Sequence, residues 1–272
     1  MMNNDRRNIL SGSAVAGLAA LGLAELSGCA TAGAAAGSSS NAKLLFALPQ
    51  PTLPIVGTSE VFPVRRIYCV GRNYAAHSRE MGSDPTREPP FFFQKPSDAI
   101  QYVAPGTTVD HPYPPLTKNY HYEIELVAAL HKGGRNVTVE QALDLVYGYA
   151  AGLDMTRRDL QRAMGDEKKP WEIGKSFDKS APIGPIHRAA DIGHVKDGAI
   201  SLKVNGNVKQ NAKLDQMIWS VAEQISRLSQ AFELMPGDII FSGTPENVGP
   251  VVRGDLMEGQ VAGLPLLSVR VV

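Results

Sequence analysis

Proline and glycine interrupt the chain after residue 60 so often that long helices are excluded from most of it. Proline cannot continue a helix or a central strand, and glycine favours turns. The intervening runs are short and rich in β-branched and aromatic residues, which is typical of strands. The expected strands are residues 66–71, 91–94, 120–131, 200–204, 238–242 and 264–272. The pattern therefore predicts a β-rich α+β domain.

Two segments are exceptions to this strand pattern. A short helix is expected over 139–146 and a longer one over 214–234. In the longer segment, apolar residues recur at three- and four-residue steps, so they share one helix face. They are Leu214, Met217, Ile218, Val221, Ala222, Ile225, Leu228 and Phe232. We expect this helix to end at Pro236-Gly237 and to pack against the sheet rather than to bind a partner.

The charge balance excludes a large class of functions. The chain has 27 Lys+Arg against 27 Asp+Glu, a net charge of zero. Nucleic-acid binding needs a clustered excess of basic residues, so no nucleic-acid partner is expected. The hydrophobic content of 43% is sufficient for a buried core. Cys29 and Cys69 are too few for a disulfide scaffold or a zinc finger.

The first 40 residues have the layout of an export signal. Arg6-Arg7 precede an apolar run over 9–26, and small residues follow. The paired arginines resemble a twin-arginine signal. The sequence Leu-Ser-Gly ahead of Cys29 resembles a lipobox, which would make this cysteine a lipid anchor. The alternative is an ordinary signal peptide cleaved near Ala32.

These patterns divide the chain into three parts. Residues 1–28 are the expected export signal, and 29–60 are an expected tether, because Ala/Gly/Ser-rich and proline-containing chain is flexible or extended. Residues 61–272 are the expected folded domain. We expect an exported protein, periplasmic or membrane-anchored in a bacterium, or a cytoplasmic one if the signal is not functional.

Three acidic residues are candidate metal ligands. Glu123 and Glu125 share one face of the expected strand over 120–131, and close carboxylates repel unless exposed, protonated or bridged by a cation. Asp154 follows an apolar run and would complete a set of three oxygens, which suits Mg²⁺, Mn²⁺ or Ca²⁺. Two alternatives remain open. The glutamates could form a solvated strand face, and Asp154 could cap a helix that begins at Met155.

A histidine, a glutamate and a lysine are candidates for acid–base and charge chemistry. His77 and Glu80 are three residues apart, so one helical turn brings them into contact. A carboxylate beside an imidazole raises its basicity, as in a general base for water. Lys175 lies among apolar residues and could stabilise developing negative charge. The alternatives are a surface contact for the pair, and an exposed lysine near Asp178.

The joint order of these motifs resembles the fumarylacetoacetate hydrolase family. The matching blocks are Gly-Arg-Asn-Tyr (71–74), Phe-Phe-Phe-Gln-Lys-Pro (91–96), Tyr-Glu-Ile-Glu-Leu (122–126), Asp-Met-Thr-Arg-Arg-Asp-Leu-Gln (154–161), Gly-Lys-Ser-Phe-Asp (174–178), Val-Asn-Gly (204–206), Pro-Gly-Asp (236–238) and Gly-Thr-Pro (243–245). They extend from about Ile67 to the C-terminus. Within the family, the blocks over 91–96 and 217–222 are most similar to fumarylpyruvate and other acylpyruvate hydrolases.

This resemblance implies a mixed-strand, barrel-like β-roll, a homodimer and a divalent cation, Mg²⁺ or else Mn²⁺ or Ca²⁺. It assigns the metal to Glu123, Glu125 and Asp154. It makes His77 and Glu80 the pair that activates water, and it makes Lys175 and Gln161 the contacts for the oxyanion. The residues that it assigns to substrate binding are Arg72, Tyr74, Arg157 and Thr244.

The implied activity is hydrolysis of a C–C bond in a small anionic 2-oxo acid with a second carbonyl, an acylpyruvate. Fumarylpyruvate, cleaved to fumarate and pyruvate, is one such substrate. Two alternatives remain open: a 2-oxo-acid decarboxylase or keto–enol isomerase on the same metal site, and a non-catalytic periplasmic lipoprotein that binds dicarboxylates. Family members are mostly cytoplasmic, so the apparent export signal departs from the family pattern.

Overall fold

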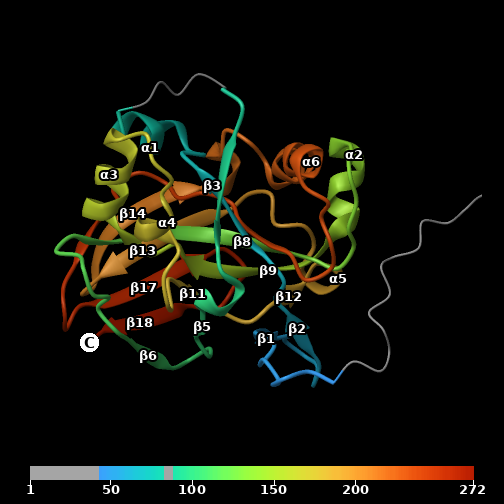
Figure 1. Cartoon of the computed structure of the whole chain (residues 1–272), viewed down its shortest axis with the longest axis horizontal. Helices are drawn as coiled ribbons and strands as arrows, with labels where there is room; N and C mark the ends of the chain where they lie inside the picture. Colours follow the sequence, from blue (N-terminus) through green and yellow to red (C-terminus); the bar gives the residue numbers. More distant parts are fainter. Residues whose placement is uncertain (1–42, 83–87) are drawn as a thin grey trace, which may run out of the picture. The chain divides into compact units, whose positions relative to one another are not determined.

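The computed structural model describes residues 43–82 and 88–272, and Figure 1 shows their arrangement. The chain divides into two units, Met1–Ala47 and Leu48–Val272. Every helix and strand of the described residues belongs to the second unit. The predicted export signal over 1–28 and the predicted lipid anchor at Cys29 lie outside the described residues. In the described part, no helix is both long and apolar enough to cross a bilayer.

Two large sheets form the body of the described part of the second unit. The first is ordered β4-β3-β15-β8-β9-β11-β5, with β12 paired to β9. Its strands are β3 (Ile67–Gly71), β4 (Phe91–Lys95), β5 (Ile100–Tyr102), β8 (Ile124–Leu130), β9 (Val146–Leu153), β11 (Ala181–Ile183), β12 (His187–Arg188) and β15 (Ile239–Phe241). The second is ordered β14-β13-β17-β18-β6. Its strands are β6 (Thr108–His111), β13 (Ala199–Val204), β14 (Asn207–Lys213), β17 (Leu256–Val261) and β18 (Leu267–Val271).

Smaller sheets and short helices complete the unit. The small sheets pair β1 (Thr52–Pro54) with β2 (Val61–Pro63), and β7 (Tyr120–Tyr122) with β10 (Thr156–Arg157) and β16 (Gly249–Val251). The helices are α1 (Ala75–Glu80), α2 (Val139–Ala142), α3 (Arg158–Asp166), α4 (Glu172–Lys175), α5 (Ala189–Ile192) and α6 (Val221–Ala231). Strands β13 and β17 contact β8 and β9, so the two large sheets pack together. The predicted β-rich α+β fold is confirmed.

Strand β8 lies between two hydrophobic cores. Its even-numbered residues join one core, together with Leu202 of the second sheet. Its odd-numbered residues from 127 onward join the core on the opposite face, together with Phe241. This alternation is that of a strand buried on both faces. Glu123 and Glu125 precede these residues on the odd-numbered side, so the packing of the strand fixes the direction of both carboxylates.

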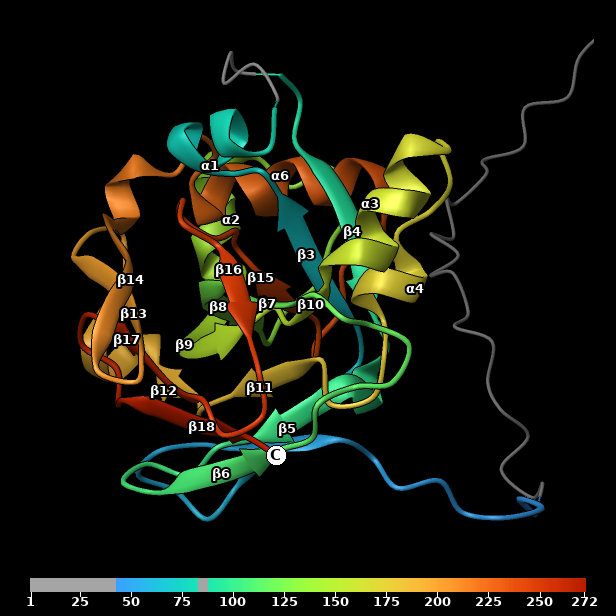
Figure 2. The ribbon, with the colours of Figure 1, turned by 90° about the vertical axis from the view of Figure 1, so that its left-hand side faces the viewer.

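Helices α1, α3 and α4 surround one end of β3. Figure 2 shows α1 on one side of this strand and α3 with α4 on the other. Helix α4 contacts both α3 and β4, which joins this pair of helices to the edge of the first sheet. Functional side chains on these helices therefore face one another across the end of the sheet.

The predicted single strand over 120–131 is wrong in one respect, because the chain changes sheets at Glu123. Strand β7 pairs with β10 and β16, whereas β8 pairs with β9 and β15. At the junction, the Ile124 amide donates to the side chain of Gln210 at 3.1 Å. The Glu123 carbonyl accepts from the amide of Asp154 at 2.9 Å. These partners are distant in sequence, so the local pattern does not reveal the change.

The predicted helix over 214–234 is also wrong in its extent. Helix α6 covers only 221–231, and residues 214–216 form a separate 3₁₀ turn. Ser220 begins α6 as an N-cap, since its hydroxyl accepts from the amide of Glu223 at 3.4 Å. The Glu223 carboxylate accepts in return from the amide of Ser220 at 2.9 Å. This capping box is a stronger start signal than the apolar periodicity that extends past it.

Two further segments differ from the sequence-based expectation. The helix predicted over 139–146 is reduced to α2 and a 3₁₀ turn over 143–145, because β9 begins at Val146. The predicted tether over 29–60 is wrong for residues 52–55, because 52–54 form β1, Ile55 forms an isolated bridge with Ile186, and Leu53 and Ile55 are buried in the core with Phe241. Proline is compatible with an edge strand, so the prolines there do not indicate flexible chain.

The imidazole of His111 provides a testable pH dependence of stability. Its Nδ1 lies 2.6 Å from Gln101 Oε1, and its Nε2 lies 2.5 Å from the hydroxyl of Tyr120. Burial, followed by the nearby Lys179, lowers the pKa of His111 to about 4, whereas an unfolded chain has a histidine pKa of about 6.5. As the pH falls from about 6.5 to about 4, His111 binds a proton in the unfolded chain but not in the folded chain. We expect this to lower the free energy of unfolding by about 3 kcal/mol.

In His111→Gln this contribution is absent, so the free energy of unfolding should fall less steeply from pH 7 to pH 4 than in the wild type. Urea unfolding at several pH values measures the difference. Burial and the nearby Lys132 also lower the pKa of His131, so His194→Gln, at an exposed position, is the matched control and should follow the wild type. Equal slopes for wild type and His111→Gln would contradict the prediction.

Candidate active site

Three buried carboxylates converge at the end of the first sheet. Strands β8 and β9 are antiparallel, and Glu125 of β8 pairs with Gly152. Glu123, just before β8, accepts at its carbonyl from the amide of Asp154, just beyond β9, so the three acids project from the same face. The exposed fractions are 3% for Glu123, 1% for Glu125 and 1% for Asp154. One oxygen from each residue lies within 4.8 Å of the others. The structure thus brings together the three residues that the sequence analysis named as metal ligands.

The alternatives for these acids, a solvated strand face and a helix N-cap, are both wrong. Glu123 and Glu125 are buried, so solvent does not separate their charges. Asp154 does not begin a helix, because α3 begins at Arg158. Residues 156–157 form strand β10 instead.

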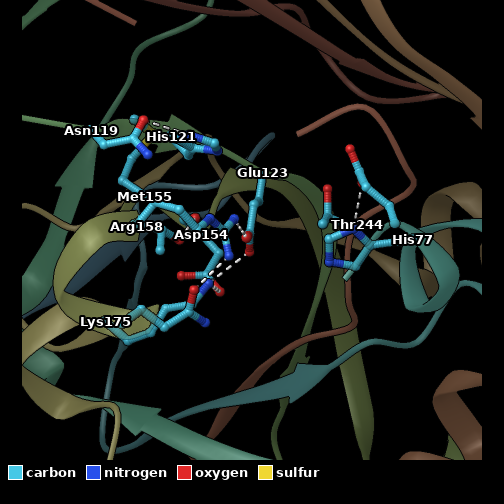
Figure 3. A network of polar contacts seen from close by, with 12 residues as sticks. His77, Asn119, His121, Glu123, Asp154, Met155, Arg158, Lys175 and Thr244 are labelled. Carbon is cyan, nitrogen blue, oxygen red and sulfur yellow. Dashed lines mark hydrogen bonds and ion pairs between the residues drawn. The ribbon is translucent and has the colours of Figure 1, made fainter. Parts of the chain in front are cut away.

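Basic side chains surround two of the three acids. The Lys175 ammonium lies 2.7 Å from Glu123 Oε2 and 2.7 Å from Asp154 Oδ2, bridging the two carboxylates (Figure 3). Arg158 pairs with the other oxygen of Glu123. Lys95 lies 2.8 Å from the other oxygen of Asp154. Lys175 is therefore not the exposed lysine of the alternative interpretation, since its side chain is only 3% exposed.

These contacts give the three acids different proton affinities. Burial raises the pKa of Glu123, but Lys175 and Arg158 outweigh this effect and hold it well below its usual range. Burial, Asp154 and Glu123 raise the pKa of Glu125 well above its usual range. Its carboxylate accepts from the amide of Gly243 at 2.7 Å, and within the described residues no basic side chain pairs with it.

A divalent cation fits this donor set. Hard oxygen ligands suit Mg²⁺ and Mn²⁺, and such ions commonly bind a few carboxylates together with water and substrate oxygens. The acid without a basic partner, Glu125, faces two other carboxylates, and a cation among them would offset their repulsion. The residues that would hold the ion are Glu123, Glu125 and Asp154.

Helix α1 carries the predicted pair of His77 and Glu80. Nδ1 of His77 lies 3.0 Å from Oε2 of Glu80. The same oxygen accepts from the amide of Asn247 at 3.1 Å, which orients the carboxylate. An Nδ1–H donated to Glu80 leaves Nε2 of the ring as the proton acceptor. Figure 3 shows His77 facing the carboxylates from the opposite side of the pocket, next to Thr244.

The start of α1 is held in place by Asn73. Its side-chain amide donates to the carbonyls of Trp219 (2.9 Å) and Ser242 (2.8 Å), and its Oδ1 accepts from the amide of Trp219 (2.8 Å). A Cβ on Gly243 would lie 2.6 Å from that of Asn73, and the φ of Gly243 is +100°. Only glycine suits such a position, so the Gly-Thr-Pro block is needed for close approach of the backbone.

One pocket connects the carboxylates with His77. Its empty volume is about 320 Å³, and its lining includes all three acids and His77. Among the residues assigned to substrate binding or the oxyanion, the structure places four in this lining: Arg72, Gln161, Lys175 and Thr244. Gln161 lies on α3 and accepts from Arg158 at 2.5 Å.

The structure does not bring the other two assigned substrate residues, Arg157 and Tyr74, into this pocket. The Arg157 guanidinium stacks 4.3 Å from the ring centroid of Phe177, and it donates to the carbonyl of Ile173 at 3.4 Å. Tyr74 is buried at the start of α1. Arg157 ends β10 and Arg158 begins α3, so the two side chains point in different directions. Arg158, rather than Arg157, therefore lines the pocket.

Two basic residues of the site, Arg158 and Lys95, were not assigned a role from the sequence. Arg158 lines the pocket and pairs with Glu123. Lys95 lies behind Asp154 and donates to the carbonyls of Met155 (3.2 Å) and Lys175. A lysine at the end of an apolar strand is expected to be buried and to need polar partners. The position of Lys95 in the Phe-Phe-Phe-Gln-Lys-Pro block could therefore have predicted its role.

Comparisons with known proteins agree with this site. The family model for fumarylacetoacetate (FAA) hydrolase, C-terminal, matches residues 66–272. The chain is similar to a fumarylpyruvate hydrolase of Ralstonia sp, with 46% identity over 188 residues, which covers 69% of this chain and 95% of the relative. It is also similar to the mitochondrial oxaloacetate tautomerase FAHD1 of Homo sapiens, with 40% identity over 207 residues, covering 76% and 91%.

A solved structure extends the similarity to the fold. The crystal structure of fumarylpyruvate hydrolase from Pseudomonas aeruginosa in complex with Mn²⁺ and pyruvate matches with a TM-score of 0.83 and 60% identity. The match covers 85% of this chain and 99% of that chain. Fold, buried acids and sequence similarity thus coincide over the second unit, and the chain belongs to the fumarylacetoacetate hydrolase family.

Proposed function

We propose that this chain is a metal-dependent hydrolase that cleaves the C–C bond of an acylpyruvate, with fumarylpyruvate, which yields fumarate and pyruvate, as the leading candidate. The observation that carries the proposal is one pocket in which three buried carboxylates face the His77–Glu80 pair. The Ralstonia and Pseudomonas relatives are fumarylpyruvate hydrolases, and the latter was crystallised with Mn²⁺ and pyruvate. We propose Mg²⁺ or Mn²⁺ as the cation at Glu123, Glu125 and Asp154.

Each residue of the pocket has a place in this reaction. A bound divalent cation supplies positive charge that lowers the energy of the enolate leaving as pyruvate. His77 accepts a proton from water at Nε2, and the hydroxide adds to the distal acyl carbonyl. Glu80 holds the ring through Nδ1 and stabilises the imidazolium. Lys175 and the side-chain amide of Gln161 can donate to the oxyanion.

The second half of the reaction returns that proton. When the C–C bond breaks, its electron pair moves to the methylene carbon of the pyruvate half. The imidazolium of His77 then protonates that carbon, which gives pyruvate and the acyl half as a carboxylic acid that releases its proton to solvent. One water is consumed, and the histidine ends neutral, so the cycle balances in atoms and charge.

A second candidate is oxaloacetate tautomerisation or decarboxylation at the same site. The 40% identity to an oxaloacetate tautomerase supports it. The His77–Glu80 pair does not separate the two candidates, because a base can take a proton from water or from the methylene group of oxaloacetate; the higher identities to the two fumarylpyruvate hydrolases, 46% and 60%, rank hydrolysis first. Binding without turnover is the less favoured proposal, since it requires no such base.

A substrate panel separates these functions. The full chain is incubated with fumarylpyruvate, acetylpyruvate or oxaloacetate, with Mn²⁺ or Mg²⁺ and then with excess chelator. We expect loss of the acylpyruvate enol absorbance, with one pyruvate released per substrate, that stops on chelation. Carbon dioxide or enol–keto exchange from oxaloacetate without acylpyruvate cleavage would support the second candidate. Metal-independent cleavage would contradict the proposed site.

We also propose that the chain is exported, with Cys29 as a lipid anchor, and that it forms a homodimer. The support is the residue pattern of 1–40 for export and the family resemblance for the dimer. Fractionation of cells that express wild type or Cys29→Ala tests the anchor, and sedimentation of the purified chain tests the dimer. Wild-type protein found in the cytoplasm as a monomer would contradict both proposals.

A further inference from the structure

A wider second pocket adjoins the catalytic pocket. The two share Arg72, Met81, Gln161 and Trp171 in their linings, so they are continuous. The second, which we call the outer pocket, has an empty volume of about 1330 Å³. Its other lining residues are Glu80, Gly82, Arg162, Gly165, Asp166, Lys168 and Lys169.

Helix α3 extends along both pockets. Arg158, Gln161, Arg162 and Gly165 stand at three- and four-residue intervals, so they share one helix face. Arg158 lines the catalytic pocket, Gln161 lines both, and Arg162 and Gly165 line the outer pocket. This face therefore leads from the carboxylates into the outer pocket.

The outer pocket carries available positive charge. Lys169 is paired with Glu167. Neither Arg162 nor Lys168 forms an ion pair with any residue in the described ranges 43–82 and 88–272. Lys168 follows the end of α3, where its amide donates to the carbonyl of Gly165 at 3.0 Å and its φ is +56°.

The two acids of the outer pocket form no ion pair with Arg162 or Lys168 within the described ranges, so they offset this charge only in part. Glu80 is engaged by His77 and by the amide of Asn247. Asp166 is exposed on the last turn of α3. Arg72, which both pockets share, lies against the rings of Phe91 and Trp171 at the junction. Beyond it, Arg162 and Lys168 are basic groups that a ligand in the outer pocket would meet.

The proposed reaction fixes which end of the substrate reaches this charge. Its 2-oxo-acid end lies at the three carboxylates, and the carbonyl under attack lies next to His77. The remainder of the acyl group continues past His77, through the junction formed by Gln161 and Trp171, into the outer pocket. An acyl group that ends in a carboxylate would extend that anion toward Arg162 and Lys168, which line the outer pocket.

We propose that Arg162 and Lys168 are specificity-determining residues that favour acylpyruvates with a second carboxylate at the end of the acyl group. The inference rests on the proposed function for the direction of the substrate. Both side chains are exposed, so their effect acts through attraction of the anion and falls with ionic strength.

The test compares fumarylpyruvate with acetylpyruvate, which lacks the distal carboxylate, in Arg162→Gln, Lys168→Gln and the double variant. We expect the ratio of kcat/KM for the two substrates to fall about threefold for each variant and about tenfold for the double variant. The change should lie mainly in KM. Added salt should reduce the ratio in the wild type and have little effect in the double variant. Lys203→Gln, an exposed β13 residue outside both pockets, is the matched control and should keep the wild-type ratio.

Calorimetric titration of the Mn²⁺-loaded wild type and variants with both compounds measures binding apart from turnover. It therefore tests the outer-pocket proposal separately from the proposed function. If the wild type cleaves neither compound but binds fumarylpyruvate more tightly, and the double variant loses that preference, the activity proposal fails and the outer-pocket proposal stands. If the double variant retains the wild-type preference in binding or in turnover, the outer-pocket proposal is overturned.

Discussion

His77→Ala should lower kcat for acylpyruvate cleavage by about a thousandfold while Mn²⁺ affinity stays within about threefold of wild type. The ring stands opposite the carboxylates and pairs with Glu80 rather than with the expected metal ligands. Its removal therefore takes away the base for water but leaves the three oxygens in place. Initial rates of pyruvate release and calorimetric titration with Mn²⁺ measure the two quantities.

Two comparison variants sharpen this result. Glu80→Gln keeps a hydrogen-bonding partner for Nδ1 but removes its charge, so kcat should fall less than in His77→Ala. His131→Ala removes an exposed imidazole outside the pocket and should leave kcat unchanged. Near-normal turnover by His77→Ala would show that another group activates water. Loss of Mn²⁺ binding in that variant would show that α1 supports the metal site.

Glu123→Gln and Glu125→Gln should both lower Mn²⁺ affinity by a hundredfold or more, yet change the stability of the metal-free protein in different ways. Even partners that only orient a metal ligand contribute about 10- to 100-fold in affinity, so a direct ligand should contribute no less. Glu123 pairs with Lys175 and Arg158, and loss of its charge leaves these cations buried. We expect a loss of about 3–5 kcal/mol in the free energy of unfolding.

Glu125 has no such partners within the described residues, and it faces two other acids. In Glu125→Gln the amide oxygen can still accept from Gly243, and the amide NH₂ can donate to a neighbouring carboxylate. The free energy of unfolding without metal should therefore be unchanged or higher. Urea unfolding in the presence of chelator measures it for both variants. Equal destabilisation by the two substitutions would contradict the charge distribution described for the site.

The acids of the site were predictable from the sequence because the evidence for them is local. Glu123 and Glu125 are two residues apart in a strand-forming run, and His77 and Glu80 are one helical turn apart. Spacing of this kind determines which side chains share a face, whatever the rest of the fold. Asp154 was a candidate from its place after an apolar run, the family resemblance assigned it to the metal, and the structure places it with the other two acids.

The basic half of the site was less predictable, because its partners are remote in sequence. Lys95 lies on an edge strand and reaches Asp154 through the pairing of β3 and β4 and the packing of α4. Whether Arg157 or Arg158 lines the pocket depends on where β10 ends and α3 begins. The hydrogen bond from the Arg158 amide to the Asn119 carbonyl, at 2.8 Å, helps to fix that point.

The interruption of the chain by proline and glycine determined that the domain consists of short strands, since these residues restrict the backbone locally. The same density did not determine how the strands associate. The change of sheet at Glu123, the incorporation of residues 52–55 and the shortening of α6 all depend on contacts between distant segments. Local spacing was thus sufficient to predict the three acids, the His77–Glu80 contact and the fold class. Which cations balance those acids, and where the pocket opens, could not be predicted in this way, because burial and charge pairing arise when remote segments pack together.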